Sequence, residues 1–288
     1  MNEMKYNKLG YSDMNISRIS LGCVTFGREI NQMDSFKIMD YAIDHGMNYF
    51  DTAEAYGEGA SELVVGSWLK KRESRMKVYI GTKLLPPYTP EGIVSSCNKS
   101  LKRLQTPIID LYQLHSFHES ALKPESLLAF DSLIKEGKVR SLGISNFSAQ
   151  ELKTFFDLQK KLGLHTLCCI QNNHNKAIQN LDENLLEFCR EEGIGSISFS
   201  PLGAGFLTGK YKSTIPTGSR FDILPGHQAL YFNDKTANAL EKLESEAAQS
   251  GKSVVELALS WVIRNPDITT TLVGVRRIAH IDQALCLV

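Results

Sequence analysis

The sequence has no surplus of charge of either sign. Its 288 residues include 32 Lys and Arg and 32 Asp and Glu, so the formal net charge is zero when the histidines are neutral. Nucleic acids and anionic membrane surfaces attract proteins that carry a basic surplus, although a local anion site is compatible with this balance. We therefore expect neither a nucleic acid nor a membrane as a partner.

Metal-ligand patterns, disulfide patterns and long apolar runs are also missing. The six cysteines include no CxxC pair, and the seven histidines include no HExxH. We therefore predict no metal site and reduced, buried thiols. No apolar run is long enough to cross a bilayer, and the N-terminus lacks the apolar core of a signal peptide. Together these absences favour a cytoplasmic protein.

Short apolar runs alternate with amphipathic segments along the whole chain. Continuous apolar runs indicate strands buried on both faces, and their alternation with helices indicates a parallel sheet. The expected strands are 19–24, 47–50, 77–82, 108–114, 139–144, 166–171, 194–199 and 269–273. The expected helices are 34–45, 60–71, one from about 89, 124–136, 148–162, 182–192, 234–250, 253–264 and one from 278, with a long irregular stretch at 202–232.

About eight strands and no visible linker predict one domain over residues 1–288, with an α/β fold built as a single (β/α)8 TIM barrel. A β-hairpin is expected over residues 5–20, where it can plug the bottom of the barrel. The alternative is a doubly wound open sheet, which usually has an early GxGxxG. The only comparable run, residues 203–209, follows a late strand, and no clear helix begins inside it.

Polar residues follow the apolar runs where each strand should end. Asp51, Lys83 and His115 occupy three such positions, and Tyr56 lies in a glycine-bounded loop close behind Asp51. If the strands are neighbours in one parallel sheet, these four side chains converge at one rim. Each also has an ordinary structural explanation: Asp51 as a helix cap, Lys83 as a solvated loop residue, Tyr56 as a half-buried aromatic and His115 as a rim histidine.

The combination suits protonation of a carbonyl oxygen during reduction. Tyr56 supplies a phenol proton, and a nearby Lys83 ammonium favours the phenolate and so lowers the pKa of the phenol. Asp51 pairs with Lys83 and keeps it charged and aimed. His115 can hydrogen-bond to the substrate oxygen and orient it. General acid catalysis of this kind contributes about 10²–10⁴-fold.

Four motifs resemble those of the aldo-keto reductase family. They are Phe50–Gly57 with Gly59–Glu62, Asp110–His115, Gly143–Phe147, and Ser200–Leu202 with Leu207–Lys210. The resemblance covers nearly the whole chain. It implies that Tyr56, Asp51, Lys83 and His115 are catalytic, in an NADPH-dependent reduction of aldehydes or ketones to alcohols by direct hydride transfer.

The resemblance also implies a site for NADPH or NADP+. The matching residues are Ser145, Asn146 and Gln171 at the nicotinamide carboxamide, Phe199 on the nicotinamide ring, Ser200, Leu202, Gly205 and Lys210 around the pyrophosphate, and Gly274 and Arg276 at the phosphate-binding end. A fixed guanidinium fork suits a phosphate, so the preference for NADP over NAD rests mainly on Arg276.

The chain departs from the family pattern at several positions. His280, Gln283 and Ala284 stand where relatives have a Gln and a Glu-Asn pair near the adenine, and His174 stands where a Tyr is usual. The chain stops at Val288, where relatives continue, so we expect a truncated C-terminal tail.

The predicted function is therefore that of an NADP-dependent reductase of a small-molecule carbonyl compound, acting as a monomer or weak oligomer. The alternative is a barrel that binds NADPH, turns over slowly and serves as a sensor or accessory subunit. Aromatic residues of the predicted rim loops either offer surface for an apolar substrate pocket or are ordinary loop anchors: Phe26, Tyr88, Phe117, Phe221 and Tyr231.

Overall fold

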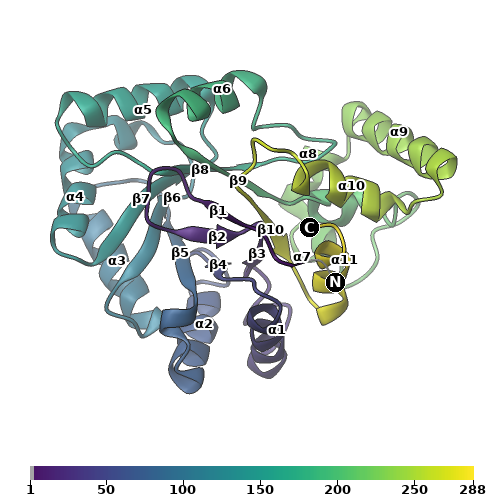
Figure 1. Cartoon of the computed structure of the whole chain (residues 1–288), viewed down its shortest axis with the longest axis horizontal. Helices are drawn as coiled ribbons and strands as arrows, with labels where there is room; N and C mark the ends of the chain where they lie inside the picture. The colour runs from purple at the N-terminus through teal and green to yellow at the C-terminus, as the bar shows by residue number, and fades with distance from the viewer. Residues whose placement is uncertain (1–2) are drawn as a thin grey trace.

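The computed structural model describes residues 3–288, in which eight parallel strands close into a barrel (Figure 1). The order around the barrel is β10-β3-β4-β5-β6-β7-β8-β9. The strands are β3 (Ile19–Gly22), β4 (Tyr49–Asp51), β5 (Tyr79–Leu84), β6 (Ile109–Leu114), β7 (Val139–Ser145), β8 (Cys169–Asn173), β9 (Gly195–Phe199) and β10 (Thr270–Gly274). The predicted barrel is confirmed, and the open-sheet alternative is wrong.

Helices surround the barrel, as the alternating pattern predicts. They are α1 (Gln32–Asp44), α2 (Ala60–Arg72), α3 (Pro90–Leu104), α4 (Pro124–Lys135), α5 (Ala149–Lys161), α6 (Glu183–Glu192), α9 (Asp234–Ser250), α10 (Val254–Ile263) and α11 (Ile278–Leu285). Local signals set their starts: the Thr89 side chain caps α3, and Ser148 and Glu151 form a capping box at α5. In the described part of the chain, no helix has both the length and the apolar character that crossing a bilayer requires.

The N-terminal hairpin lies against one end of the barrel, as predicted. Its strands are β1 (Tyr6–Lys8) and β2 (Asn15–Ser17), and Figure 1 shows it in purple in front of the barrel. Leu9, Met14 and Ile16 of the hairpin are buried in one apolar cluster with residues of the barrel strands. Because this cluster fills the hairpin end, the site is confined to the opposite end, where the strands finish.

The segment between β9 and α9 is built from short helical turns, within the stretch that the sequence predicted to be irregular. The turns are η3 (Gly203–Thr208), α7 (Arg220–Ile223), η4 (Pro225–His227) and α8 (Gln228–Tyr231). Aromatic rings hold the segment together, with Tyr211 and Phe221 at a centroid distance of 4.7 Å and Phe221 and Phe232 at 5.1 Å. This aromatic packing gives the segment a small core of its own beside the barrel.

Candidate functional site

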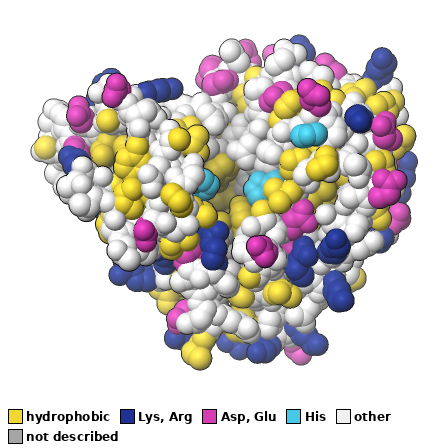
Figure 2. Space-filling model, turned by 180° about the vertical axis from the view of Figure 1, so that it is seen from behind, with side chains coloured by type: hydrophobic (Ala, Val, Ile, Leu, Met, Phe, Trp, Pro, Cys, Tyr) yellow, Lys and Arg dark blue, Asp and Glu magenta, His cyan; other side chains and the backbone are white. Residues whose placement is uncertain are grey.

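The strand ends opposite the hairpin bring three of the four predicted catalytic side chains into direct contact. Lys83 Nζ lies 2.6 Å from Asp51 Oδ2, 2.9 Å from the Thr52 carbonyl oxygen and 3.5 Å from Tyr56 Oη. Asp51 ends β4, and Lys83 lies in the neighbouring strand β5. Figure 2 views the molecule from the side opposite to that of Figure 1, and a hollow with histidine and apolar side chains at its edge opens there.

His115 is the fourth member, placed directly after β6. Its ring meets the Tyr56 ring edge-on, with 5.8 Å between the centroids and an interplanar angle of 82°. Burial, reinforced by the charge of Lys83, lowers the pKa of His115 to about 3. The imidazole is therefore neutral at physiological pH, with one nitrogen that donates and one that accepts.

Burial governs the acidity of the catalytic groups more than the sequence suggested. We expected Lys83 to lower the pKa of Tyr56, and its ammonium does act in that direction, but burial outweighs it and the pKa is raised above 10. Burial also raises the pKa of Asp51, while Lys83 works against the rise. Burial acts to lower the pKa of Lys83, but the adjacent Asp51 and Tyr56 raise it above its usual value. Tyr56 therefore holds its proton at neutral pH beside a cation.

The residues predicted at the nicotinamide lie together beside Asp51. Ser145 Oγ donates a hydrogen bond of 2.7 Å to the Gln171 carbonyl oxygen, and Asn146 Nδ2 donates one of 2.9 Å to the His115 carbonyl oxygen. Gln171 Nε2 donates to Asp51 Oδ1 over 3.2 Å, and Gln171 Oε1 is buried without a partner in the described chain. A buried acceptor without a donor costs free energy. This oxygen is therefore free to accept a hydrogen bond from a ligand N–H, such as that of a carboxamide.

Three of the predicted cofactor residues have left-handed backbones. Asn146 has a φ of 58° directly after β7, and Ser200 has a φ of 54° directly after β9. Such angles are uncommon for residues other than glycine and cluster at binding and catalytic sites. Gly205, with a φ of 90°, adopts its left-handed conformation without a Cβ penalty. The chain therefore turns sharply directly after β7 and after β9.

Positive charges gather at the predicted phosphate-binding end. Burial lowers the pKa of His280, and the charges of Arg277, Lys210 and Arg276 lower it further, which places these groups near one another. The Arg276 backbone N–H donates to His280 Nδ1 over 3.3 Å, and its guanidinium donates to the Gly218 carbonyl oxygen over 2.7 Å. This cluster of positive charges suits an anion, although one nitrogen of the Arg276 guanidinium already donates to the Gly218 carbonyl oxygen.

The remaining predicted cofactor residues border the same end of the barrel. Phe199 and Leu202 are half-buried at and just after the end of β9, and Gly274 is exposed at the end of β10. A Cβ added at Gly274 would meet only Val24 Cγ1, at 3.9 Å. The backbone of Gly274 is therefore open to approach by a ligand.

Sequence reasoning missed an ion-pair cluster centred on Glu29. This carboxylate is 2% exposed and lies 2.7 Å from Arg28, 2.8 Å from Arg220 and 3.8 Å from Arg276. The charge of Arg220 also acts on the pKa of Tyr56, so the cluster borders the hollow. Three guanidinium groups against one carboxylate leave a positive surplus. No local signal could have found it, because Glu29 and Arg220 meet only in the folded barrel.

The expected aromatic lining is wrong at four of its five positions. Phe26, Tyr88, Phe221 and Tyr231 are at most 2% exposed. They anchor their loops in apolar clusters instead of facing a ligand. Phe117 is half-buried and packs edge-on against Phe147.

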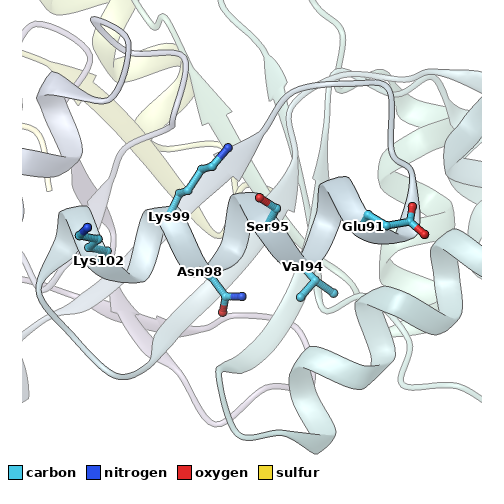
Figure 3. A pocket seen from close by; sticks show the side chains of 6 residues that line it. All are labelled: Glu91, Val94, Ser95, Asn98, Lys99 and Lys102. Atoms are coloured by element: carbon cyan, nitrogen blue, oxygen red, sulfur yellow. The ribbon is translucent and has the colours of Figure 1, made fainter.

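A second hollow lies on the outside of the barrel, along α3 (Figure 3). Its lining side chains are Glu91, Val94, Ser95, Asn98, Lys99 and Lys102. All of them belong to the surface of one helix, and none is a member of the site at the strand ends. The barrel mouth is therefore the stronger candidate.

A buried ion pair that holds a protonated phenol at the mouth of a (β/α)8 barrel indicates a barrel oxidoreductase. Comparison with known sequences identifies the family. Residues 18–287 match the aldo/keto reductase family, and the chain belongs to it.

The chain is similar to proteins with several different names. The chain is 31% identical over 291 residues to "Probable aldo-keto reductase 1" of Glycine max, covering 96% of this chain and 82% of the relative. It is 30% identical over 309 residues to "Protein tas" of Escherichia coli (strain K12), covering 94% and 89%. It is also 30% identical over 295 residues to "Probable voltage-gated potassium channel subunit beta" of Arabidopsis thaliana, covering 97% and 90%.

Proposed function

We propose that this protein reduces the carbonyl group of an aldehyde or ketone to an alcohol, with NADPH as the hydride donor and Tyr56 as the proton donor. The observation that carries the proposal is the buried contact series from Asp51 through Lys83 to the Tyr56 hydroxyl. Proton donation to a developing alkoxide requires a protonated acid, and the raised pKa of Tyr56 keeps the proton in place.

Each catalytic side chain has a separate role in the proposed reaction. NADPH, when bound, supplies a hydride to the carbonyl carbon. The carbonyl oxygen gains negative charge and takes the proton from Tyr56 Oη. The Lys83 ammonium stabilises the phenolate that remains until it regains a proton from water, and Asp51 keeps Lys83 charged. The neutral His115 donates a hydrogen bond that orients the carbonyl oxygen.

The residues at the strand ends fit the nicotinamide part of this cofactor. The unpartnered Oε1 of Gln171 is positioned to accept from the carboxamide, with Ser145 and Asn146 beside it. At the other end, Arg276 and Lys210 are suited to the phosphates. The ligands that we propose are therefore an NADP-type cofactor and a small carbonyl compound.

The alternative function, a slow NADPH-binding accessory subunit, is favoured by one observation. Relatives named as voltage-gated potassium channel beta subunits match nearly the whole chain. In either role we propose a cytoplasmic monomer or weak oligomer. The free cysteines, of which only Cys286 is exposed, agree with a reducing compartment.

The test compares the wild-type protein with Tyr56→Phe in NADPH oxidation with a reactive aromatic aldehyde. We expect turnover to fall by about 10²–10⁴-fold, because the general acid is lost. NADPH binding, followed by the cofactor's fluorescence, should stay within about twofold, since the ring and its packing are retained. Tyr112→Phe, which removes a buried hydroxyl that has no partner in the described chain, is the matched control. Equal turnover by Tyr56→Phe and the wild type would contradict the proposal. Tight NADPH binding without turnover of any carbonyl compound would favour the alternative.

The cofactor preference is tested with Arg276→Met. We expect the dissociation constant of NADPH to rise by about tenfold or more, because a charge-assisted contact to phosphate is lost. The constant for NADH, which lacks the 2′-phosphate, should change much less. Equal effects on the two cofactors would show that Arg276 does not read the 2′-phosphate.

A further inference from the structure

Tyr49 lies in β4, two residues before Asp51, and therefore on the same face of the strand. Its side chain has no exposed surface, and its hydroxyl donates to Asp51 Oδ1 over 3.4 Å. Sequence reasoning predicts only an apolar strand residue at this position. In the structure it brings a hydrogen-bond donor to the buried carboxylate of the catalytic group.

Gly81, in the neighbouring strand, leaves the space that this hydroxyl occupies. A Cβ added at Gly81 would lie 2.1 Å from Tyr49 Oη and 2.8 Å from Tyr49 Cζ, distances that no real packing allows. Asp51 and Gly81 are register partners in β4 and β5. The two strands are thus complementary: one provides the phenol, and the other lacks the side chain that would displace it.

Three side chains donate hydrogen bonds to Asp51, and they differ in distance and in the oxygen that accepts. Lys83 donates to Oδ2 over 2.6 Å, while Gln171 and Tyr49 share Oδ1. Gln171 also carries the unpartnered buried Oε1, so the position of its amide depends on Asp51 at one atom and on whatever pairs with Oε1 at the other. Within residues 3–288, Tyr49 Oη has no other hydrogen-bond partner, and its ring packs in an apolar cluster with Leu111 and Ile197.

We propose that Tyr49 is a positioning residue, whose hydroxyl holds the Asp51 carboxylate ionised and oriented so that Lys83 stays aimed at Tyr56. The proposal rests on the proposed function for its effect on turnover. Its effect on Asp51 itself is independent of that function.

The groups that face Asp51 set the direction of the expected pH effect. Besides Lys83, Gln171 and Tyr56, they include the thiols of Cys23 and Cys169. Burial raises the pKa of both thiols, so they stay neutral and do not compete as anions.

Tyr49 is protonated for the same reason. Burial and the charge of Asp51 raise the pKa of its phenol, which keeps it a donor. The hydrogen bond from Tyr49 lowers the pKa of Asp51, so its removal must raise that pKa.

The decisive variant is Tyr49→Phe, which keeps the ring and removes only the donor. We expect kcat for aldehyde reduction to fall by about three- to tenfold, the effect of one ordinary hydrogen bond, because the 3.4 Å contact is longer than a strong charge-assisted bond. The acid limb of the kcat profile should move to higher pH, and the NADPH dissociation constant should stay within about twofold. Tyr112→Phe is again the control, because its buried hydroxyl has no partner in the described chain and its ring packs against Phe130, 6.1 Å away.

A second readout does not depend on turnover. Carboxyl ¹³C NMR titration of aspartate-labelled protein, with the Asp51 signal assigned through Asp51→Asn, should show Asp51 titrating at higher pH in Tyr49→Phe than in the wild type. An unchanged Asp51 titration, or an unchanged kcat and pH profile in an active enzyme, would overturn the role of Tyr49. An inactive wild type that still shows the NMR shift would refute the proposed function and support the contact.

Discussion

Burial decides the charge state of the histidines at the strand ends. His115 and His174 are both surrounded by protein, and burial lowers the pKa of His174 to about 4. His174 stacks on Trp261 at a centroid distance of 5.0 Å, and its Nδ1 accepts from the Leu181 backbone N–H. The residue that departs from the family pattern therefore has a structural role as a neutral ring.

The pH dependence of stability follows from these neutral rings. Between pH 4 and 6.5, an unfolded His174 binds a proton that the folded ring does not bind, so the free energy of unfolding rises with pH in this window. His174→Asn keeps an acceptor but cannot titrate. It should flatten the rise by at most about 1.4 kcal/mol per pH unit. Urea unfolding at several pH values measures this, and an unchanged slope would show that His174 is protonated in the folded protein.

Among the helices and strands, one buried carboxylate links three elements. Glu62 of α2 has no exposed surface; it accepts from Thr82 Oγ1 of β5 over 2.6 Å and from Arg103 Nε of α3 over 2.5 Å. The helices approach closely there, since a Cβ on Gly66 would lie 2.3 Å from the Arg103 carbonyl oxygen. The contact holds α2 and α3 in place against the strand that carries Lys83.

Removing this carboxylate should destabilise the protein. Glu62→Ala leaves Arg103 and Thr82 without their partner, and we expect a loss of about 3 kcal/mol in the free energy of unfolding. Glu136→Ala, which breaks the more exposed pair with Lys138 at 2.8 Å, should cost no more than about 1 kcal/mol. Chemical denaturation of both variants decides the matter, and equal costs would show that burial does not set the strength of the pair.

The helices were easier to predict from the sequence than the exact strand ends. The helix at 234–250 was predicted with the bounds of α9, because its polar pattern and a following Gly mark both ends. The strand expected at 166–171 lies instead at Cys169–Asn173, so Gln171 is inside β8 and not at its tip. The apolar residues at its start are buried beside the hairpin without being part of the strand, and an apolar run alone does not separate these two cases.

The side chains of the site were predictable where they end or follow an apolar run, and unpredictable where their contacts come from distant segments. Asp51, Lys83 and His115 follow or end apolar runs, so the barrel topology alone brings them together. Glu29 and Arg220 are 191 residues apart in the chain and meet only because a long segment folds back over the barrel. In the sequence, Tyr49 is an ordinary strand aromatic. Its contact with Asp51 depends on Gly81, a residue of another strand that has no Cβ.

At the scale of the whole molecule, one arginine joins the beginning and the end of the barrel. Arg18, just before β3, donates to the carbonyl oxygens of Ile263, at the end of α10, and of Asn265 and Ile268, between α10 and β10. β3 and β10 are neighbours in the closed sheet. The Arg18 side chain therefore ties the first barrel strand to the chain that leads into the last one.

Arg18→Met tests this tie. The variant keeps the aliphatic stem and leaves several carbonyl oxygens without a donor, so we expect a loss of about 2–4 kcal/mol in the free energy of unfolding. Arg190→Met, which removes a surface arginine that is 45% exposed, should cost about 1 kcal/mol or less. A small effect of Arg18→Met in urea unfolding would mean that strand pairing alone closes the barrel.

The hairpin described above covers one end of the barrel, and buried side chains fill the interior beside it. Ligands that reach Asp51 must therefore enter and leave by the opposite end of the barrel. Where two ligands stack at this end, the deeper one must bind first and leave last, because the upper one blocks its way out. Binding of that kind gives ordered kinetics, in which the upper product inhibits release of the lower one.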